Sequence, residues 1–308
     1  MTEQLYILFC ESPLQKNQVD EDYNDEFIAA RENGFKTLLF NFEDLISADR
    51  SSEATSRITT NDKLVKVIYR GWMLTPKQYS LLYSNLLIKN YILINTVDEY
   101  QNCHYLPNSL KYIESRTPKT VFEKFNYENS VDKLIAKSKI FGGRSVIVKD
   151  YVKSEKHNWE TACFVKDASN VDNLKLTIKN LINLRGKHLN EGIVIREFLE
   201  LNNLIIHSKS GMPLTEEYRL FFLNKKLIGI YDYWEEGDYK FSKPDTTEFE
   251  EIAKQIESNF FSMDIARLKS GELVIIELGD GQVAGLPDKT NRDEFYKQFM
   301  HLLLLTAG

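Results

Sequence analysis

The amino-acid sequence predicts a parallel α/β unit followed by two α+β lobes. Over residues 1–100, short apolar runs alternate with amphipathic helical segments, a pattern that favours a parallel sheet covered by helices. Beyond residue 100 this alternation stops, and strand-like runs follow one another with short connections. Two pairs of such runs, at 217–233 and 260–278, are typical of antiparallel hairpins. The expected fold class is therefore α/β and α+β.

The composition is that of a globular protein with one large domain or two ordinary ones. Of its 308 residues, 43% are hydrophobic and 27% are charged. The formal net charge of −6 argues against a general nucleic-acid binder, which usually has an excess of basic residues. Cys10, Cys103 and Cys163 form no CxxC motif, so we expect a reducing compartment and no zinc site. We expect no signal peptide and no membrane span, which makes a cytoplasmic location the default.

The first 100 residues are expected to form an N-terminal α/β domain. Its strands are predicted at 5–10, 35–40, 65–70 and 91–94, and its helices at 22–32 and 76–87. In the second helix, Tyr79, Leu82 and Leu86 recur at helical spacing, and Pro76 stands in the first turn. Gly34 is a stop signal for the first helix.

Residues 101–308 are expected to form a second domain, with a small lobe at about 117–190 and a large lobe at about 191–308. The expected elements are helices within 97–116, an extended piece at 116–122, a helix at 131–139, strands at 144–150 and 162–165, a helix at 172–184, a strand at 193–199, a hairpin of 217–223 with 226–233, a helix at 247–257, a hairpin of 260–268 with 273–278, and a helix at 292–305. Asn291 is the expected N-cap of the last helix.

Each strand of the 260–278 hairpin carries one carboxylate among apolar residues. Asp264 lies in the first strand and Glu277 in the second. The sequence GDGQ at 279–282 ends the second strand. Unpaired buried charges are costly, so two acids on neighbouring strands need a cation or a proton near them. A hard divalent cation such as Mg²⁺ takes oxygen ligands and would suit this pair. The alternative is that one acid pairs with a Lys or Arg side chain.

A cationic side chain, Lys149, ends the apolar strand VIVK, and a polar loop follows it. A lysine in this position can point its ammonium group at a phosphate from a rigid base. The loop 151–159 contains the candidate phosphate contacts Lys153, Ser154 and Lys156 and could fold over an anion. The alternatives are a lysine that extends to solvent from the strand end and a loop that is simply solvated.

Two further strands place polar groups where they could meet a nucleotide. The strand GIVIREFLEL passes through Glu197, Phe198 and Leu199, whose backbone could pair with an adenine edge, and Glu200 could hold a ribose hydroxyl. Arg219 lies near the start of the next strand, where it could neutralise phosphate charge. A cross-strand ion pair with a neighbouring glutamate is the alternative for Arg219.

Substrate contacts are expected at the carboxyl end of a strand in the N-terminal domain. Ligands bind at such ends in parallel sheets, and Arg70 and Trp72 follow the strand at 65–70. They could bind an acid or a flat group, although Trp72 could equally pack against the neighbouring lobe. His104 has no metal-like spacing to another ligand, and we interpret it as structural.

Taken together, these segments resemble the ATP-grasp superfamily over nearly the whole chain. The order of the Lys-bearing strand, the polar loop, the acid-rich hinge, the Arg-bearing strand and the two acids is similar, and the 13-residue separation of Asp264 and Glu277 resembles that of D-alanine ligase-like members. Three segments resemble a particular ATP-grasp branch: VDEDY at 19–23, RGWM at 70–73 and ELGDGQVAGLP at 277–287.

The resemblance implies an ATP-grasp architecture, in which two α+β lobes clamp a nucleotide beside the N-terminal α/β lobe. By this resemblance, Lys149 would contact the phosphates of ATP under the loop 151–159. Residues 197–199 would form the adenine hinge, and Arg219 would stabilise the transferred phosphoryl group. Asp264 and Glu277 would hold one or two Mg²⁺ ions.

The implied function is an ATP- and Mg²⁺-dependent ligase that forms an amide-type bond. Its partners would be a small-molecule or peptide carboxylate and an amine, joined through an acyl-phosphate. A kinase of the same fold and a non-catalytic nucleotide-binding module are the alternatives.

The sequence also departs from the family pattern. Many members have an Asn two residues after the metal-binding Glu, whereas this chain has Gly279, so Asp280 as a metal ligand and Gln282 as a substrate contact are the candidate replacements.

Overall fold

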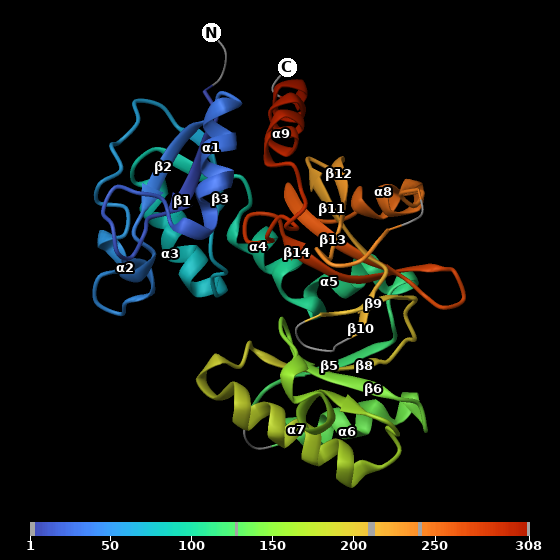
Figure 1. The fold of residues 1–308 in the computed structure, drawn as a ribbon. Coiled ribbons are helices and arrows are strands. Elements are labelled where there is room, and N and C mark those ends of the chain that lie inside the picture. The colour runs from blue at the N-terminus through green and yellow to red at the C-terminus, as the bar shows by residue number, and fades with distance from the viewer. Residues whose placement is uncertain (1–3, 127–128, 209–212, 240–241, 307–308) are drawn as a thin grey trace.

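The computed structural model describes residues 4–126, 129–208, 213–239 and 242–306. Figure 1 shows three lobes: an N-terminal lobe in blue, a small lobe in green and yellow, and a large lobe in orange and red. The segment that links the first lobe to the others contains α4 (Val97–His104) and α5 (Leu106–Ile113). Every helix in these ranges is too short or too polar to cross a membrane.

The N-terminal lobe is a four-stranded parallel sheet in the order β2-β1-β3-β4. Its elements are β1 (Tyr6–Cys10), α1 (Asn24–Glu32), β2 (Lys36–Phe40), α2 (Phe42–Ile46), β3 (Val65–Arg70), α3 (Pro76–Leu87) and β4 (Tyr91–Leu93). Side chains alternate along β1, so Leu8 packs with the α3 core while Ile7 and Phe9 pack with α1 and the C-terminal helix. The predicted parallel sheet is confirmed, and α2 was not predicted.

The small lobe is an antiparallel sheet in the order β5-β8-β6-β7, packed against α6 and α7. Its elements are β5 (Thr120–Lys124), α6 (Ser130–Ser138), β6 (Val146–Asp150), β7 (Phe164–Val165), α7 (Val171–Arg185) and β8 (Gly192–Glu197). Residues Trp159–Cys163 form a π-helix, so the predicted strand at 162–165 is only two residues long. Because β8 pairs with β5 and β6, this sheet extends beyond the expected lobe boundary at 190.

The large lobe is an antiparallel sheet in the order β12-β11-β13-β14. Its elements are β11 (Glu217–Leu223), β12 (Lys226–Asp232), α8 (Thr247–Ala253), β13 (Phe260–Arg267), β14 (Leu273–Asp280) and α9 (Arg292–Thr306). Both predicted hairpins are present, but β14 continues two residues past the predicted end at 278. The Glu294 N–H donates to the side chain of Asn291 at 3.1 Å, which confirms the predicted cap of α9. A small sheet of β9 (Asn203–Ile206) and β10 (Pro213–Thr215) was not predicted.

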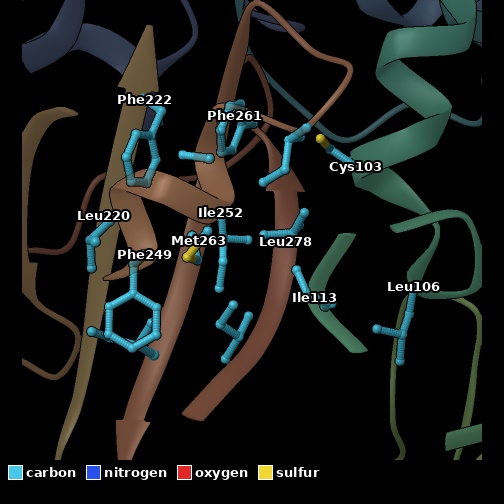
Figure 2. Packing of buried hydrophobic residues seen from close by; sticks show 14 of the residues in the cluster. Cys103, Leu106, Ile113, Leu220, Phe222, Phe249, Ile252, Phe261, Met263 and Leu278 are labelled. Carbon is cyan, nitrogen blue, oxygen red and sulfur yellow. The ribbon is translucent and has the colours of Figure 1, made fainter. Parts of the chain in front are cut away.

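The two faces of the large sheet differ in chemistry. Figure 2 shows one face, where Phe222, Phe261 and Met263 pack beneath Phe249 and Ile252 of α8, with Cys103 and Ile113 beside β14. The side chains between these positions, including Arg219 and Asp264, point to the other face because successive strand residues alternate. On that other face Phe221, Leu223 and Phe260 pack against α9, and Arg219 and Asp264 lie beyond this apolar cluster.

Arg70, predicted to contact substrate, is a buried structural residue. It is 1% exposed and donates from Nε and Nη2 to the carboxylate of Glu26, both at 2.8 Å. Its Nη1 donates to the carbonyls of Gly281 and Ala284, while the Tyr296 hydroxyl donates to Glu26 at 2.7 Å. The strand end that carries Arg70 is covered by α1, α9 and the segment after β14, and its substrate contact stays a prediction.

Replacing Glu26 with Gln should destabilise the protein by about 3–5 kcal/mol, because it leaves the Arg70 guanidinium buried without a counter-charge. Chemical denaturation would measure this loss. Glu32→Gln, at an exposed position of the same helix, is the control. Equal stabilities for the two variants would contradict the structural role of the Glu26–Arg70 pair.

Candidate active site

One cavity of about 270 Å³ brings together the four residues on which the sequence prediction depended most. Lys149 reaches it from β6, Arg219 from β11, Asp264 from β13 and Glu277 from β14. The other residues that line it are Met73, His104, Leu106, Tyr151, Val152, Lys153, Tyr233, Ser262, Leu278, Gly279, Asp280, Val283, Ala284 and Gly285. The cavity thus lies between the small and large sheets, beside the N-terminal lobe.

The two carboxylates stand directly opposite one another on neighbouring strands. Asp264 pairs with Glu277 in the β13–β14 register, and each acid has a cationic partner. Arg219 binds Asp264 through two hydrogen bonds of 2.8 and 2.7 Å, while Lys149 Nζ lies 3.2 Å from Glu277 Oε2. The sequence predicted this acid pair, and the ion pairs are the arrangement it gave as an alternative to a metal.

The surroundings shift the two acids in opposite directions. Burial raises the pKa of Asp264 above its usual range, and Arg219 offsets only part of this effect. Burial also acts to raise the pKa of Glu277, but the charges of Lys149 and Lys156 outweigh it, and the net pKa is lowered. The pair therefore depends on nearby cations to stay charged.

Arg219 is held rigidly in the cavity wall. Its guanidinium lies 4.8 Å from the centre of the Tyr233 ring, and Nη1 donates to the carbonyl of Gly285 at 2.9 Å. Asp264 strongly raises its pKa against the effect of burial, so it remains a cation at any physiological pH. A fixed planar guanidinium is suited to bidentate contact with phosphate oxygens.

The loop after β6 begins with a tight turn that directs Lys153 into the cavity. The Asp150 carboxylate accepts from the backbone N–H groups of Val152 and Lys153 at 2.7 and 2.6 Å, and Arg185 pairs with it. Lys156 acts electrostatically on both Asp264 and Glu277. Ser154 instead hydrogen-bonds to the thiol of Cys163.

The predicted hinge lies outside this cavity, at the carboxyl end of β8 in the small sheet. Glu197 pairs with Arg144 at 3.1 Å and Glu200 with Lys269 at 2.9 Å, while the Phe198 ring packs against Phe164 at 5.1 Å. The N–H groups of Glu197 and Phe198 donate to backbone carbonyls. Among the described residues, the N–H groups of Leu199 and Glu200 have no hydrogen-bond acceptor, so both are available donors at the end of β8.

Asp280 and Gln282, the predicted metal and substrate contacts, make buried hydrogen bonds within the protein. Asp280 borders the cavity, but its carboxylate accepts from Asn95 Nδ2 at 2.6 Å and from Gln282 N at 2.9 Å. Gln282 is fully buried, with Nε2 donating to Tyr79 and Oε1 accepting from the backbone N–H of Tyr69. Within the described ranges, no group of three or more acidic, His or Cys side chains could hold a metal ion. These side chains tie β14 to the N-terminal lobe, and their metal and substrate roles stay predictions.

Trp72 lines a different cavity, of about 290 Å³, at the carboxyl edge of the N-terminal sheet. Its Nε1 donates to Asp20 at 3.1 Å, and its ring meets Tyr23 edge-on at 5.4 Å. The next residue, Met73, lines the cavity with the acid pair. The predicted approach of this segment to the site is therefore made by Met73 rather than by Trp72.

His104 and Ser262 line the cavity but were not predicted as site residues. His104 was interpreted as structural; it is buried and stacks on Tyr100 at 5.0 Å, but it also lines the cavity. Ser262 lies two residues before Asp264 and thus on the same strand face, a spacing that could have identified it. A Cβ atom added at Gly279 would lie 2.7 Å from Ser262 Oγ. The glycine at 279 therefore leaves room for the serine opposite.

Comparison with known proteins identifies the fold. A family model of the ATP-grasp domain, clade family 3, matches residues 141–299, just over half of the chain. A RimK domain ATP-grasp protein from Sphaerobacter thermophilus is 12% identical, with a TM-score of 0.58 over 97% of this chain and 99% of its own. D-alanyl-alanine synthetase A from Vibrio cholerae is 13% identical, with a TM-score of 0.54 over 99% and 100%.

A further similar structure is the ATP-grasp ligase PsnB in complex with a minimal precursor, Mg and ADP. It is 12% identical, with a TM-score of 0.55 over 96% of this chain and 97% of its own. No curated protein sequence matches the chain. At these identities the likeness shows a shared fold, and the expected ATP-grasp architecture is confirmed.

His104 should make the stability depend on pH. Burial lowers its pKa from 6.5 to about 4, so between these values the unfolded chain binds a proton that the folded protein does not. The free energy of unfolding should therefore fall as the pH drops through this window, by at most about 1.4 kcal/mol per pH unit. Denaturation at several pH values should show a weaker slope for His104→Phe, with His301→Phe at an exposed position of α9 as the control. A slope unchanged in His104→Phe would refute this assignment.

Proposed function

The chain belongs to the ATP-grasp domain family, and from this premise we propose that it is an ATP- and Mg²⁺-dependent carboxylate–amine ligase. The observation that carries the proposal is the cavity in which Asp264 and Glu277 face each other between Lys149 and Arg219. In this proposal residues 1–100 form the N-terminal domain, and residues 101–308 form the nucleotide-binding domain.

The cations around the cavity support a triphosphate site. Lys149 comes from the small sheet and Arg219 from the large sheet, so phosphates between them would be bound from two sides. Lys153 and Lys156 would cover the phosphates from the loop after β6, with Ser154 as a further candidate donor. Binding would let phosphate oxygens replace the carboxylates as partners of Lys149 and Arg219.

The adenosine would lie at the carboxyl end of β8. The unpaired N–H of Leu199 is a suitable donor to an adenine nitrogen, with Glu197 and Phe198 forming the rest of the hinge. Glu200 would accept a hydrogen bond from a ribose hydroxyl. Its ion pair with Lys269 would break first, at little cost because both side chains are exposed to water.

The donor set of Asp264 and Glu277 fits Mg²⁺. Both are carboxylates, they stand opposite one another, and they border the same cavity as the candidate phosphate contacts. When bound, Mg²⁺ would neutralise phosphate charge and orient the terminal phosphate. Ser262, on the same strand face as Asp264, would add a hydroxyl oxygen beside the pair.

The proposed reaction has two steps. A carboxylate oxygen of the first substrate attacks the γ-phosphorus, ADP leaves, and an acyl-phosphate forms. An amine nitrogen then attacks the acyl carbon, phosphate leaves, and the nitrogen loses a proton. Arg219 and Lys149 would stabilise the charge that spreads over the transferred group. Met73, Leu106 and Val283 would help to exclude water, which otherwise hydrolyses the intermediate.

Relatives support two classes of substrate. PsnB was solved with a precursor peptide, and D-alanyl-alanine synthetase is named for a small amino-acid product. We propose that this chain acts on a carboxylate of one of these two classes.

Replacing Glu277 with Gln should remove the Mg²⁺ dependence of nucleotide binding. The change keeps the shape but loses a charged ligand, so affinity for Mg²⁺ with the ATP analogue AMPPNP should fall at least about tenfold. Without Mg²⁺, AMPPNP should bind no more weakly than to the wild type, because Lys149 loses its acidic partner. Isothermal titration calorimetry measures both quantities.

The matched control is Glu272→Gln, at an exposed position of the same hairpin. Unchanged Mg²⁺-dependent binding in Glu277→Gln would refute the nucleotide site.

Turnover should appear as ADP release that requires both a carboxylate and an amine. A panel of amino acids and short peptides, tested in pairs and analysed by mass spectrometry, should yield a condensed product with loss of one water. A stable phosphorylated product would instead identify a kinase. Nucleotide binding without turnover of any pair would favour the non-catalytic alternative.

A further inference from the structure

A buried arginine that the proposed site does not use contacts the backbone just before Glu277. Arg196 of β8 is 7% exposed, and its Nη1 donates to the carbonyl of Ile276 in β14. Its Nη2 donates to Thr117 Oγ1 and, at 3.2 Å, to the carbonyl of Ile275. Nε has no partner, and no carboxylate of the described chain forms an ion pair with this guanidinium. Arg196 is therefore a buried cation bound mainly to backbone carbonyls.

These carbonyls belong to a β-bulge. Asp264 pairs with Glu277, but the next pair along β13 is Ile265 with Ile275, so Ile276 is the extra residue. Bulges bend a strand and re-aim the adjacent side chains, and they leave the extra residue without a ladder partner. Here Arg196 donates to the carbonyl of Ile276, and the Thr117 hydroxyl donates to the carbonyl of Ile275 at 2.7 Å. The two residues before Glu277 are thus fixed by side chains from outside the large sheet.

The cost of burying Arg196 argues that it has a specific role. A buried charge without a counter-charge is unfavourable, and an apolar side chain of similar size would fill this space more cheaply. Burial lowers the pKa of its guanidinium to about 10, an effect that the charge of Glu277 partly offsets. Only a long, multiply donating side chain can hold both carbonyls and the threonine hydroxyl at once.

Arg196 also belongs to the sheet that supplies Lys149. β6 and β8 are neighbours, with Lys149 opposite Val194 and Ile147 opposite Arg196. Lys149 contacts the carboxylate of Glu277, and Arg196 contacts the backbone just before it. The small sheet therefore holds Glu277 from both its side chain and its main chain.

We propose that Arg196, with Thr117, is a positioning residue that fixes the bulge at Ile276 and so aims the Glu277 carboxylate at the metal–nucleotide site. This inference rests on the proposed function, because it gives Glu277 the role of metal ligand. It predicts that the two lobes must keep their mutual arrangement for Mg²⁺ to bind.

The test is calorimetric titration of ADP into wild type, Arg196→Met, Arg196→Lys and Thr117→Val over a range of Mg²⁺ concentrations. Loss of a group that orients a metal ligand typically lowers metal affinity about 10- to 100-fold, and we expect this for Arg196→Met. Thr117→Val should give a smaller loss in the same direction, and Arg196→Lys should not restore wild-type affinity. ADP binding without Mg²⁺ should stay unchanged.

Arg116→Met is the matched control, since Arg116 lies at the same junction but makes an exposed ion pair with Glu248. Variants that lose thermal stability but keep the wild-type Mg²⁺ dependence would overturn the positioning role and leave Arg196 as a fold contact. If Arg196→Met does not fold, Thr117→Val decides the question by the same criterion. A wild type that binds no Mg²⁺–ADP would refute the proposed function and this inference together.

Discussion

Two carboxylates held opposite each other on adjacent buried strands impose the main electrostatic constraint on this protein. Asp264 and Glu277 repel one another, and the buried Asp264 is screened less by solvent than Glu277, whose side chain is 37% exposed. The protein meets this constraint with two cations from different lobes. Arg219 is a strand neighbour of Asp264 within the large sheet, whereas Lys149 reaches Glu277 from the small sheet. The charge balance of the site therefore depends on how the two sheets face each other.

The N-terminal lobe is bound to this arrangement by polar contacts rather than by a linker alone. Arg70 joins α1 to the segment after β14, and Asn95 donates to Asp280 at the end of β14 and to the backbone of β13. Gln282 adds a contact to the backbone of β3. Each of these groups has its hydrogen bonds satisfied by another segment, as buried polar groups require. The segment 283–285 and Met73, next to these contacts, line the cavity.

The parts of the site that could be predicted share one property: their signal is local in the chain. A lysine at the end of VIVK and one acid in each strand of a hairpin can be recognised from strand periodicity and turn residues. The contacts that could not be predicted have the opposite property. Arg70, Asp280 and Gln282 are polar residues next to recognised motifs, and their hydrogen-bond partners lie far away in the sequence. The place of His104 in the cavity wall likewise depends on long-range packing.

By itself, the sequence determined most of the strands and helices, the parallel N-terminal sheet, the two antiparallel hairpins of the large lobe, and the acids at 264 and 277. These depend on side-chain period, on turn chemistry and on a hairpin register that short connections restrict. The tertiary structure alone decided that β8 joins the small sheet, that Arg196 reaches the bulge before Glu277, and that Gly279 faces Ser262. The last two contacts join residues 80 and 17 positions apart. No local pattern encodes them, because they arise only when separately folded segments pack and their buried polar groups must find partners.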